Sequence, residues 1–432
     1  MPQGDDGRIM KTTISTSGTD ILINDKKVYS DIEESNRSTH GLLFNARFIQ
    51  GIFDDKSDPA RFARFGFDAW DPAAQTDRLI EALPEWYSYG LRAFTVGIQG
   101  GGPCFTIDSS TIDNNPFGTD GTEFDPAYEE RLDRLIRAAD EIGLVVIVSY
   151  LYGAQAARLE DGLAVRHAVA GASRFLRDGG YTNVIIEVAN EQDIDPFRKY
   201  HPIVSEPEGM AMLIALARSE SGGLPVGCSG RGGSVFREIA EASDIVLIHG
   251  NGQSRQHYYN LIERAKRYSP DKPVICNEDS QAIGQLTVAA HTRTSWGYYN
   301  NMTKQEPPTR FEILPGEDTY FALRMAKIIG IDKEEPSIEE QYCLHGLEPD
   351  MTYDGKRWIR LGSLYPESIN FVEYYRNGSH YCTSYDEPFA VNFISNWRQD
   401  GVAVDGAGEE WIAKIVLRNG DIVEKTGSTK GR

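Results

Sequence analysis

The stretch Asn183-Val184-Ile185-Ile186-Glu187-Val188-Ala189-Asn190-Glu191-Gln192-Asp193 decides the fold that the rest of the chain must fit. Its first half is apolar and rich in β-branched residues, and its second half is a cluster of amides and carboxylates. A parallel strand that is buried on both faces has this apolar texture, and active sites open beyond the carboxyl ends of such strands. The stretch therefore predicts a buried strand whose end carries functional side chains.

The same pattern returns later in the chain as Lys272-Pro273-Val274-Ile275-Cys276-Asn277-Glu278-Asp279. Both stretches reach an Asn-Glu pair at the end of the predicted strand, at Glu191 and at Glu278. Retaining cleavage of a glycosidic bond needs two carboxyl groups about 5 Å apart, one to attack the anomeric carbon and one to protonate the leaving oxygen. Two glutamates at strand ends of one barrel meet this need, so both are candidate catalytic residues.

Strand and helix signals alternate around these two stretches. Besides the opening stretch and the one ending in Glu278, strands are expected at 41–47, 92–98, 144–150, 225–229, 244–249 and 295–299. Helical periodicity is expected at about 75–89, 128–142, 164–176, 209–218, 235–242, 258–268, 286–293 and 319–329. Such alternation predicts an α/β fold, a (β/α)8 TIM barrel. An open doubly wound sheet is disfavoured, because Gly100-Gly101-Gly102 is too short for a phosphate-binding loop.

Both ends of the chain differ in texture from this central region. Residues 1–19 predict a tail, and a β-hairpin over 20–29 leads into a barrel that spans 20–335. Beyond it, the turn signals Asp354-Gly355 and Asn419-Gly420 accompany expected strands at 371–375, 390–394 and 411–417. Residues 336–432 are therefore expected to form a small antiparallel β domain that packs on the barrel.

Composition limits the partners. The 432 residues are 40% hydrophobic, enough for a sizeable core, and their net charge is −20. Nucleic acids and anionic membranes are held mainly by Lys and Arg, so neither is expected as a partner. A neutral oligosaccharide or polysaccharide is compatible with this charge, which is equally explained by solubility alone. The oligomeric state does not follow from the sequence.

Cysteine and histidine usage gives no sign of a cofactor. The five cysteines form no C-x-x-C pair, and no His-x-His follows the first strand, so neither a metal nor another cofactor is expected. Met1 to Met10 is polar and contains no apolar segment, so these residues are not a signal peptide and the localisation stays open. No apolar run is long enough to span a membrane.

With Asn190-Glu191 ending the fourth strand and Glu278 ending the seventh, the chain resembles clan A glycoside hydrolases, a superfamily of retaining (β/α)8 enzymes. The resemblance covers about residues 20–335 and includes the hairpin before the first strand. It implies that Glu191 is the acid/base, that Glu278 is the nucleophile and that Asn190 hydrogen-bonds the 2-hydroxyl of the sugar.

Two departures leave the family and the sugar open. Gln192 stands where many members have proline, and Gly97-Ile98-Gln99 lacks the arginine that many carry near the end of the second strand. Gln99 itself is then a candidate contact to substrate at that strand end.

Each further candidate site residue could instead have a purely structural role. His249 ends the sixth strand, where clan members often place a residue near the nucleophile, but a hydrogen-bonded structural histidine is an equal explanation. Trp296 resembles the aromatic floor under the reactive sugar, or is a core residue. Tyr152 and Tyr298 are candidates for stacking on sugars. Glu187 has the same strand parity as Glu191 and is better explained as a buried structural carboxylate.

Three functions remain in competition. The first is a retaining glycoside hydrolase that uses Glu191 and Glu278. The second is a catalytically silent barrel that only binds carbohydrate in the same cleft. The third is a metal-dependent barrel hydrolase, which the eight histidines of the chain do not favour because no ligand cluster stands at the expected strand ends.

Overall fold

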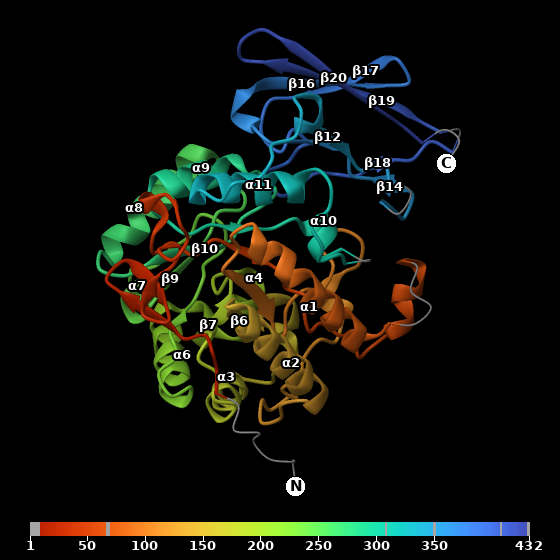
Figure 1. Cartoon of the computed structure of the whole chain (residues 1–432). Coiled ribbons are helices and arrows are strands. Elements are labelled where there is room, and N and C mark those ends of the chain that lie inside the picture. The colour runs from red at the N-terminus through yellow and green to blue at the C-terminus, as the bar shows by residue number, and fades with distance from the viewer. Residues whose placement is uncertain (1–8, 66–69, 307–308, 349–350, 407, 430–432) are drawn as a thin grey trace.

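The computed structural model describes residues 9–65, 70–306, 309–348, 351–406 and 408–429. Figure 1 shows parallel strands inside a layer of helices, with the C-terminal strands, in blue, beyond α9 (Gly284–His291) and α11 (Glu317–Ile329). The predicted α/β alternation is confirmed, and the antiparallel strands follow it in the chain.

Eight parallel strands form the centre of the molecule. Six make one sheet in the order β11-β4-β5-β6-β7-β8, and β10 pairs with β9 in a second. An isolated parallel bridge joins Ile275 of β10 to Ser295, and the Asp244 N–H donates to the Val226 carbonyl of β8 (2.8 Å). The bounds are β4 Asn45–Arg47, β5 Ala93–Gly97, β6 Val145–Tyr152, β7 Val184–Asn190, β8 Val226–Gly227, β9 Val246–His249, β10 Val274–Glu278 and β11 Gly297–Tyr298.

The predicted helices are all present, with their ends shifted by one turn or less. Besides α9 and α11 they are α1 Pro72–Ser88, α2 Pro126–Ile142, α3 Gly162–Asp178, α6 Pro207–Glu220, α7 Arg237–Ala242 and α8 Arg255–Tyr268. Sequence periodicity did not predict three short helices, because each is too short to show it. These are α4 Asp195–Tyr200, α5 Pro202–Ser205 and α10 Asn301–Lys304.

Aspartate side chains cap the N-termini of α1, α2 and α3. Asp71 accepts hydrogen bonds from two backbone N–H groups of α1, Asp125 from one of α2 and Asp161 from two of α3. Such caps satisfy N–H groups that have no partner inside the helix, and each contributes about 1 kcal/mol. These caps fix where the preceding loop ends and each of the three helices begins.

The N-terminal segment is more ordered than expected. β1 (Ile14–Ser17) pairs with β2 (Asp20–Ile23), which pairs with β3 (Lys26–Lys27), so the prediction of a tail is wrong for residues 14–17. The Ile14 N–H donates to the Thr182 carbonyl (2.9 Å), which ties this sheet to the start of β7. Residues 1–8 of the predicted tail lie outside the described residues.

The C-terminal strands form three antiparallel sheets, β12-β15, β13-β14-β18 and β17-β16-β19-β20. The predicted Asp354-Gly355 turn joins β13 to β14, but the strand predicted at 390–394 is wrong: only single bridges occur there, at Ala390 and Phe393. The bounds are β12 Tyr342–His345, β13 Thr352–Tyr353, β14 Lys356–Arg357, β15 Arg360–Ser363, β16 Ile369–Arg376, β17 Ser379–Ser384, β18 Val402–Ala403, β19 Glu410–Leu417 and β20 Ile422–Ser428.

Buried apolar side chains form two main cores. One fills the space between the parallel strands and their helices, and all seven residues of β7 are buried in or beside it. A separate core that includes Val372, Tyr374 and Trp411 lies within the C-terminal sheets. Within the described ranges, no helix combines the length and the apolarity that crossing a bilayer requires.

Candidate active site

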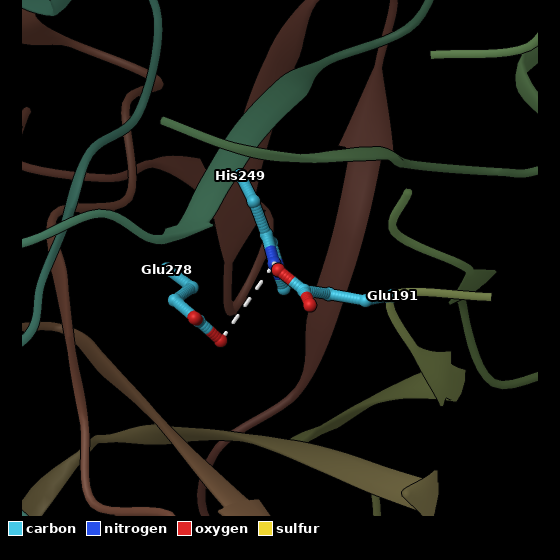
Figure 2. Close-up of side chains that lie close together, drawn as sticks. All are labelled: Glu191, His249 and Glu278. Carbon is cyan, nitrogen blue, oxygen red and sulfur yellow. Dashed lines mark hydrogen bonds and ion pairs between the residues drawn. The ribbon is translucent and has the colours of Figure 1, made fainter. Parts of the chain in front are cut away.

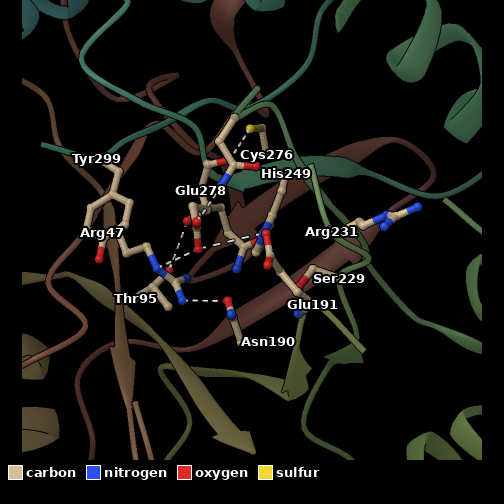
Figure 3. Close-up of polar contacts among 12 residues, drawn as sticks. Arg47, Thr95, Asn190, Glu191, Ser229, Arg231, His249, Cys276, Glu278 and Tyr299 are labelled. Atoms are coloured by element: carbon tan, nitrogen blue, oxygen red, sulfur yellow. Dashed lines mark hydrogen bonds and ion pairs between the residues drawn. The ribbon is translucent and has the colours of Figure 1, made fainter. Parts of the chain in front are cut away.

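Charged side chains from four strands meet beyond the carboxyl ends of the parallel strands (Figure 3). Arg47 ends β4, Glu191 follows β7, His249 ends β9 and Glu278 ends β10. Figure 2 shows the imidazole of His249 against the carboxylate of Glu191 and within reach of Glu278. Because parallel strands end at one edge of a sheet, residues far apart in sequence become neighbours here.

Glu278 is bound through both of its oxygens. Arg47 Nε forms an ion pair with Oε2 (2.9 Å), and the Asn251 amide donates a hydrogen bond to Oε1 (2.7 Å). The His249 Nδ1 atom lies 3.6 Å from Oε2. Since Arg47 and Asn251 are themselves buried and each contacts one carboxylate oxygen, the orientation of Glu278 is determined before any ligand arrives.

Glu191 occupies a strained and partly open position. Its φ of 54° lies in the left-handed region, which costs a residue with a side chain about 1 kcal/mol or more. Two bonds to Ser229 hold it there: the Glu191 N–H donates to the hydroxyl (3.1 Å) and the Gln192 N–H to the carbonyl (3.0 Å). About 20% of the Glu191 side chain is exposed, so it faces the solvent at the strand ends.

Glu187 lies below this pair and is fully buried. It accepts hydrogen bonds from the Ser229 hydroxyl (2.6 Å) and the Asn277 amide (3.0 Å), and His249 Nε2 lies 3.7 Å from the same oxygen. The structure therefore places it as a buried carboxylate under the site, as the sequence analysis favoured, and in contact with His249.

These contacts set the protonation of His249 and Glu187. Burial disfavours the charged imidazole, but the negative charge of Glu278 and the neighbouring carboxylates of Glu187 and Glu191 raise the pKa of His249 to about 10. Burial also disfavours the Glu187 carboxylate, but the neighbouring His249 imidazolium and the charge of Arg47 lower its pKa to about 2. At neutral pH both groups are therefore charged.

The pKa values of the two candidate catalytic carboxyl groups shift in opposite directions. Burial raises the pKa of Glu278, and the charges of Glu191 and Glu187 add to this effect against Arg47 and His249. Burial also disfavours ionisation of Glu191, but the hydrogen bond and charge of His249 outweigh it and lower the pKa of Glu191.

The same three side chains could in principle surround a cation. An imidazole nitrogen of His249 and one oxygen from each of Glu191 and Glu278 lie within 4.8 Å of one another. His249 Nδ1 already contacts Glu191 Oε1 at 3.1 Å. Arg47 also already pairs with Glu278. The donor set therefore fits an ion-paired site better than a metal centre.

Three further predicted residues lie around this centre. Asn190 Oδ1 accepts a hydrogen bond from Arg47 Nη2 (2.6 Å). The Tyr152 hydroxyl lies near enough for the charges of Glu278 and Arg47 to act on its pKa, which burial raises. Gln99 is buried and accepts a hydrogen bond from the Tyr152 N–H (3.1 Å), so its amide oxygen is engaged at the end of β6.

Trp296 and Tyr298 face away from the glutamates. Trp296 is fully buried and donates to the Asp279 carboxylate (2.7 Å). Tyr298 stacks on Phe321 of α11 (centroids 4.5 Å apart) and donates to Asp318 (2.8 Å). Alternate residues of a strand point to opposite sides, and this pair points to the helix layer. Neither residue is therefore part of the site proposed below.

Sequence reasoning missed Arg47, Asn251 and Tyr299. The Arg47 guanidinium lies 5.5 Å from the centre of the Tyr299 ring, and both are labelled in Figure 3. An arginine that ends an apolar strand was a usable signal for Arg47. Tyr299 follows from strand parity once Trp296 and Tyr298 are known to face outward. Asn251 lies in a loop and had no signal.

A scan against models of known protein families finds no match for this chain. A search of curated proteins finds none either.

Comparison with solved structures finds glycosidases at low identity. An endo-β-1,4-mannanase from Thermotoga petrophila aligns over 90% of this chain and 97% of its own, with 14% identity and a TM-score of 0.46. A β-glucuronidase from Parabacteroides merdae covers 96% of this chain and 50% of its own (10% identity, TM-score 0.41). Bacteroides uniformis β-glucuronidase 2 covers 96% of this chain and 48% of its own, with 12% identity and a TM-score of 0.42. The chain spans about half the length of both glucuronidases. These values assign neither a family nor an activity to it.

Proposed function

We propose that this chain is a retaining glycoside hydrolase that cleaves O-glycosidic bonds by double displacement. The observation that carries the proposal is that one carboxylate oxygen of Glu191 and one of Glu278 lie within 4.8 Å of each other. Retaining enzymes hold two carboxyl groups about 5 to 5.5 Å apart, whereas inverting enzymes separate them by about 6.5 to 9.5 Å to admit water. The spacing therefore supports direct attack by a carboxylate.

The proposal includes a closed (β/α)8 barrel as the frame of the site. The bridge from Ile275 to Ser295 and the hydrogen bond from Asp244 to Val226 join the two parallel sheets at both ends. We assign residues 20–335 to this barrel and residues 336–432 to a small domain of antiparallel sheets. In such barrels the catalytic groups stand at the carboxyl ends of the strands, as Arg47, Glu191 and Glu278 do here.

In the first step, Glu278 is the nucleophile. One of its oxygens forms a bond to the anomeric carbon while the bond from that carbon to the glycosidic oxygen breaks. Arg47 and Asn251 hold the carboxylate in position and Asn190, itself fixed by Arg47, binds the sugar 2-hydroxyl. Glu191 gives its proton to the leaving oxygen, which departs as an alcohol.

In the second step, Glu191 is the base. It takes a proton from a water molecule, whose oxygen attacks the anomeric carbon and releases Glu278 as a carboxylate. The exposed fifth of the Glu191 side chain provides access for this water. Glu191 ends the cycle protonated, and the product keeps the anomeric configuration of the substrate.

These roles need the proton on Glu191, whose pKa is lowered in the substrate-free site. Two features supply it. A bound sugar excludes water from the exposed part of Glu191, and loss of water raises the pKa of a carboxyl group. His249 Nδ1 also lies 3.1 Å from Glu191 Oε1, so an imidazolium proton is within transfer distance. Glu278 meanwhile keeps its pairing with Arg47.

A hydrolysis panel of 4-nitrophenyl glycosides and neutral polysaccharides tests the proposal. We expect Glu278→Ala and Glu191→Ala to lower turnover by about 10⁴-fold, because each removes a group that acts in the transition state. Azide should partly restore Glu191→Ala on 4-nitrophenyl glycosides, since this good leaving group needs no proton. EDTA should leave the wild-type rate unchanged.

Controls separate the competing functions. Both variants should keep the wild-type melting temperature, so that lost activity is not lost folding. Glycan binding without product in the wild-type protein would support the catalytically silent barrel instead, and full activity in either alanine variant would exclude the roles assigned here.

A further inference from the structure

A cavity of about 480 Å³ lies between the parallel-strand loops and the C-terminal sheets. Its wall comes from the loop after β9, the start of α9 and two C-terminal segments, 385–389 and 393–396. This volume falls in the range of about 300 to 1,000 Å³ that is usual for small-molecule sites. None of its lining residues takes part in the double displacement described above.

Short contacts connect this cavity to the catalytic pair. Asn251, which donates to Glu278, is followed directly by Gly252 in the cavity wall. The Gly252 N–H donates to Asn396 Oδ1 (2.5 Å), and the Asn396 amide in turn donates to Asp279 (3.4 Å), the residue after Glu278. The cavity wall therefore follows Asn251 directly in the chain and is hydrogen-bonded to the residue after Glu278.

The chemistry of the wall suits a sugar ring. Tyr385 is 68% exposed and Phe393 37% exposed, and both line the cavity. Gln253, Asn396 and Arg418 add amide and guanidinium groups to the same wall. A pyranose has an apolar face, which stacks on aromatic rings, and a rim of hydroxyls, which bind amides and guanidinium groups. A wall with both kinds of group matches both surfaces.

The wall is held in place across the junction of the two parts of the chain. Glu387 accepts a hydrogen bond from the Gly284 N–H (2.9 Å) and pairs with Arg255 (3.5 Å). The Gln285 amide donates to the Gln253 carbonyl (2.6 Å). Because the wall is tied on both sides, a ligand loses little free energy in ordering it.

We propose that this cavity is a distal saccharide subsite, which binds a further unit of the glycan chain that Glu191 and Glu278 cleave. The inference rests on the proposed function for the cleavage step and on the cavity for the binding step. It makes the substrate a neutral oligosaccharide or polysaccharide rather than a glycoside of a single sugar. It also gives the C-terminal sheets a part in choosing the substrate.

Affinity electrophoresis through gels containing galactomannan, arabinoxylan, xyloglucan or lichenan tests the subsite. The Glu278→Gln variant provides the background, because it prevents turnover while keeping a similar shape. We expect at least one polysaccharide to retard it, and Tyr385→Ala with Phe393→Ala to weaken that binding about tenfold, the loss of two stacking contacts. Tyr381→Ala changes an aromatic residue that is about as exposed as Phe393 but lies outside the cavity, so it should keep the binding.

The outcomes separate the subsite from the cleavage chemistry. Retardation that survives loss of both rings, or that Tyr381→Ala reduces as much, would overturn the subsite, as would no retardation by any of the four polysaccharides. Hydrolysis of 4-nitrophenyl glycosides by the wild-type protein is measured separately and decides the proposed function alone. Tyr385→Phe is the control for misfolding, because it keeps the aromatic ring and should therefore keep the binding.

Discussion

His249 is surrounded by three carboxylates, those of Glu187, Glu191 and Glu278, and its proton offsets part of their charge. Glu187 is buried and ionised, so it keeps the imidazole protonated from below. The protonated imidazole in turn favours the carboxylate form of Glu191 until a ligand changes the surroundings. A single residue thus couples the buried charge to the group that must donate a proton.

This coupling predicts a difference between two pH profiles. In the free protein His249 lowers the pKa of Glu191, and in the complex the covering sugar raises it again. Glu191 must be protonated to act, so the basic limb of kcat should lie at higher pH than the basic limb of kcat/KM, which reports the free protein. Steady-state rates between pH 4 and pH 10 on one substrate measure both.

The matching control is His249→Asn. It removes the charge that lowers the pKa of Glu191, so the basic limb of its kcat/KM profile should move to higher pH. Basic limbs that coincide in the wild-type protein, together with an unmoved limb in the variant, would contradict the coupling.

At the residue scale, the sequence located two carboxylates at strand ends. An apolar run stops at Glu191 and at Glu278, and the structure brings the two side chains close together. The charge of His249 could not be predicted, because it depends on three carboxylates from different parts of the chain. Arg47 was overlooked because an arginine was expected on the second strand and stands on the first.

At the scale of elements, β11 shows that neighbouring aromatic residues point to opposite sides, so a shift of one residue decides which ring faces the site. Trp296 and Tyr298 pack against Phe321 of α11, while Tyr299 stands beside Arg47. The predicted strand over 295–299 had the correct place in the chain, but a run of aromatics on both faces carries no signal of which face points inward.

Paired variants of β11 test this orientation. Tyr299→Ala removes the ring beside Arg47, so Glu278 loses part of its positioning and kcat/KM should fall about tenfold. Tyr298→Phe removes the hydrogen bond to Asp318, so the free energy of unfolding should fall by about 1 to 2 kcal/mol with kcat/KM unchanged. Steady-state kinetics and denaturant unfolding measure the two effects. The opposite pattern would reverse the orientation assigned to the strand.

Helices and strands differ in how well the sequence located them. Helical periodicity found each long helix because an amphipathic face repeats over several turns. The strand predicted at 390–394 failed because its apolar residues Val391 and Phe393 belong to a segment held by single bridges, part of which lines the cavity beside the site. An apolar run of this length does not say whether it pairs or lines a wall.

At the scale of the whole molecule, a buried ion pair joins the parallel-strand unit to the C-terminal sheets. Arg360 of β15 binds Glu317 of α11 through two bonds of 2.7 and 2.6 Å, and it also donates to Asn300 (3.2 Å). Both charged side chains are almost completely buried. This interface holds the C-terminal wall of the proposed subsite against the loops of the parallel strands.

Removing one partner should therefore destabilise the protein strongly. Arg360→Ala leaves the Glu317 carboxylate buried without its counter-charge, which costs about 3 to 5 kcal/mol. The partly exposed pair of Lys414 and Glu373 (3.7 Å) provides the control, and Lys414→Ala should cost less than about 1 kcal/mol. Thermal and denaturant unfolding compare them. Equal effects would mean that the interface contributes little.

The anomeric configuration of the first product tests the central claim most directly. The claim is that Glu278 attacks the anomeric carbon while Glu191 protonates the leaving oxygen. Their carboxylates lie too close together to leave room for an intervening water. Proton NMR of an early reaction mixture, recorded before mutarotation, reads that configuration on any glycoside that the protein hydrolyses. The account predicts a product with the configuration of the substrate, and an inverted product would contradict it.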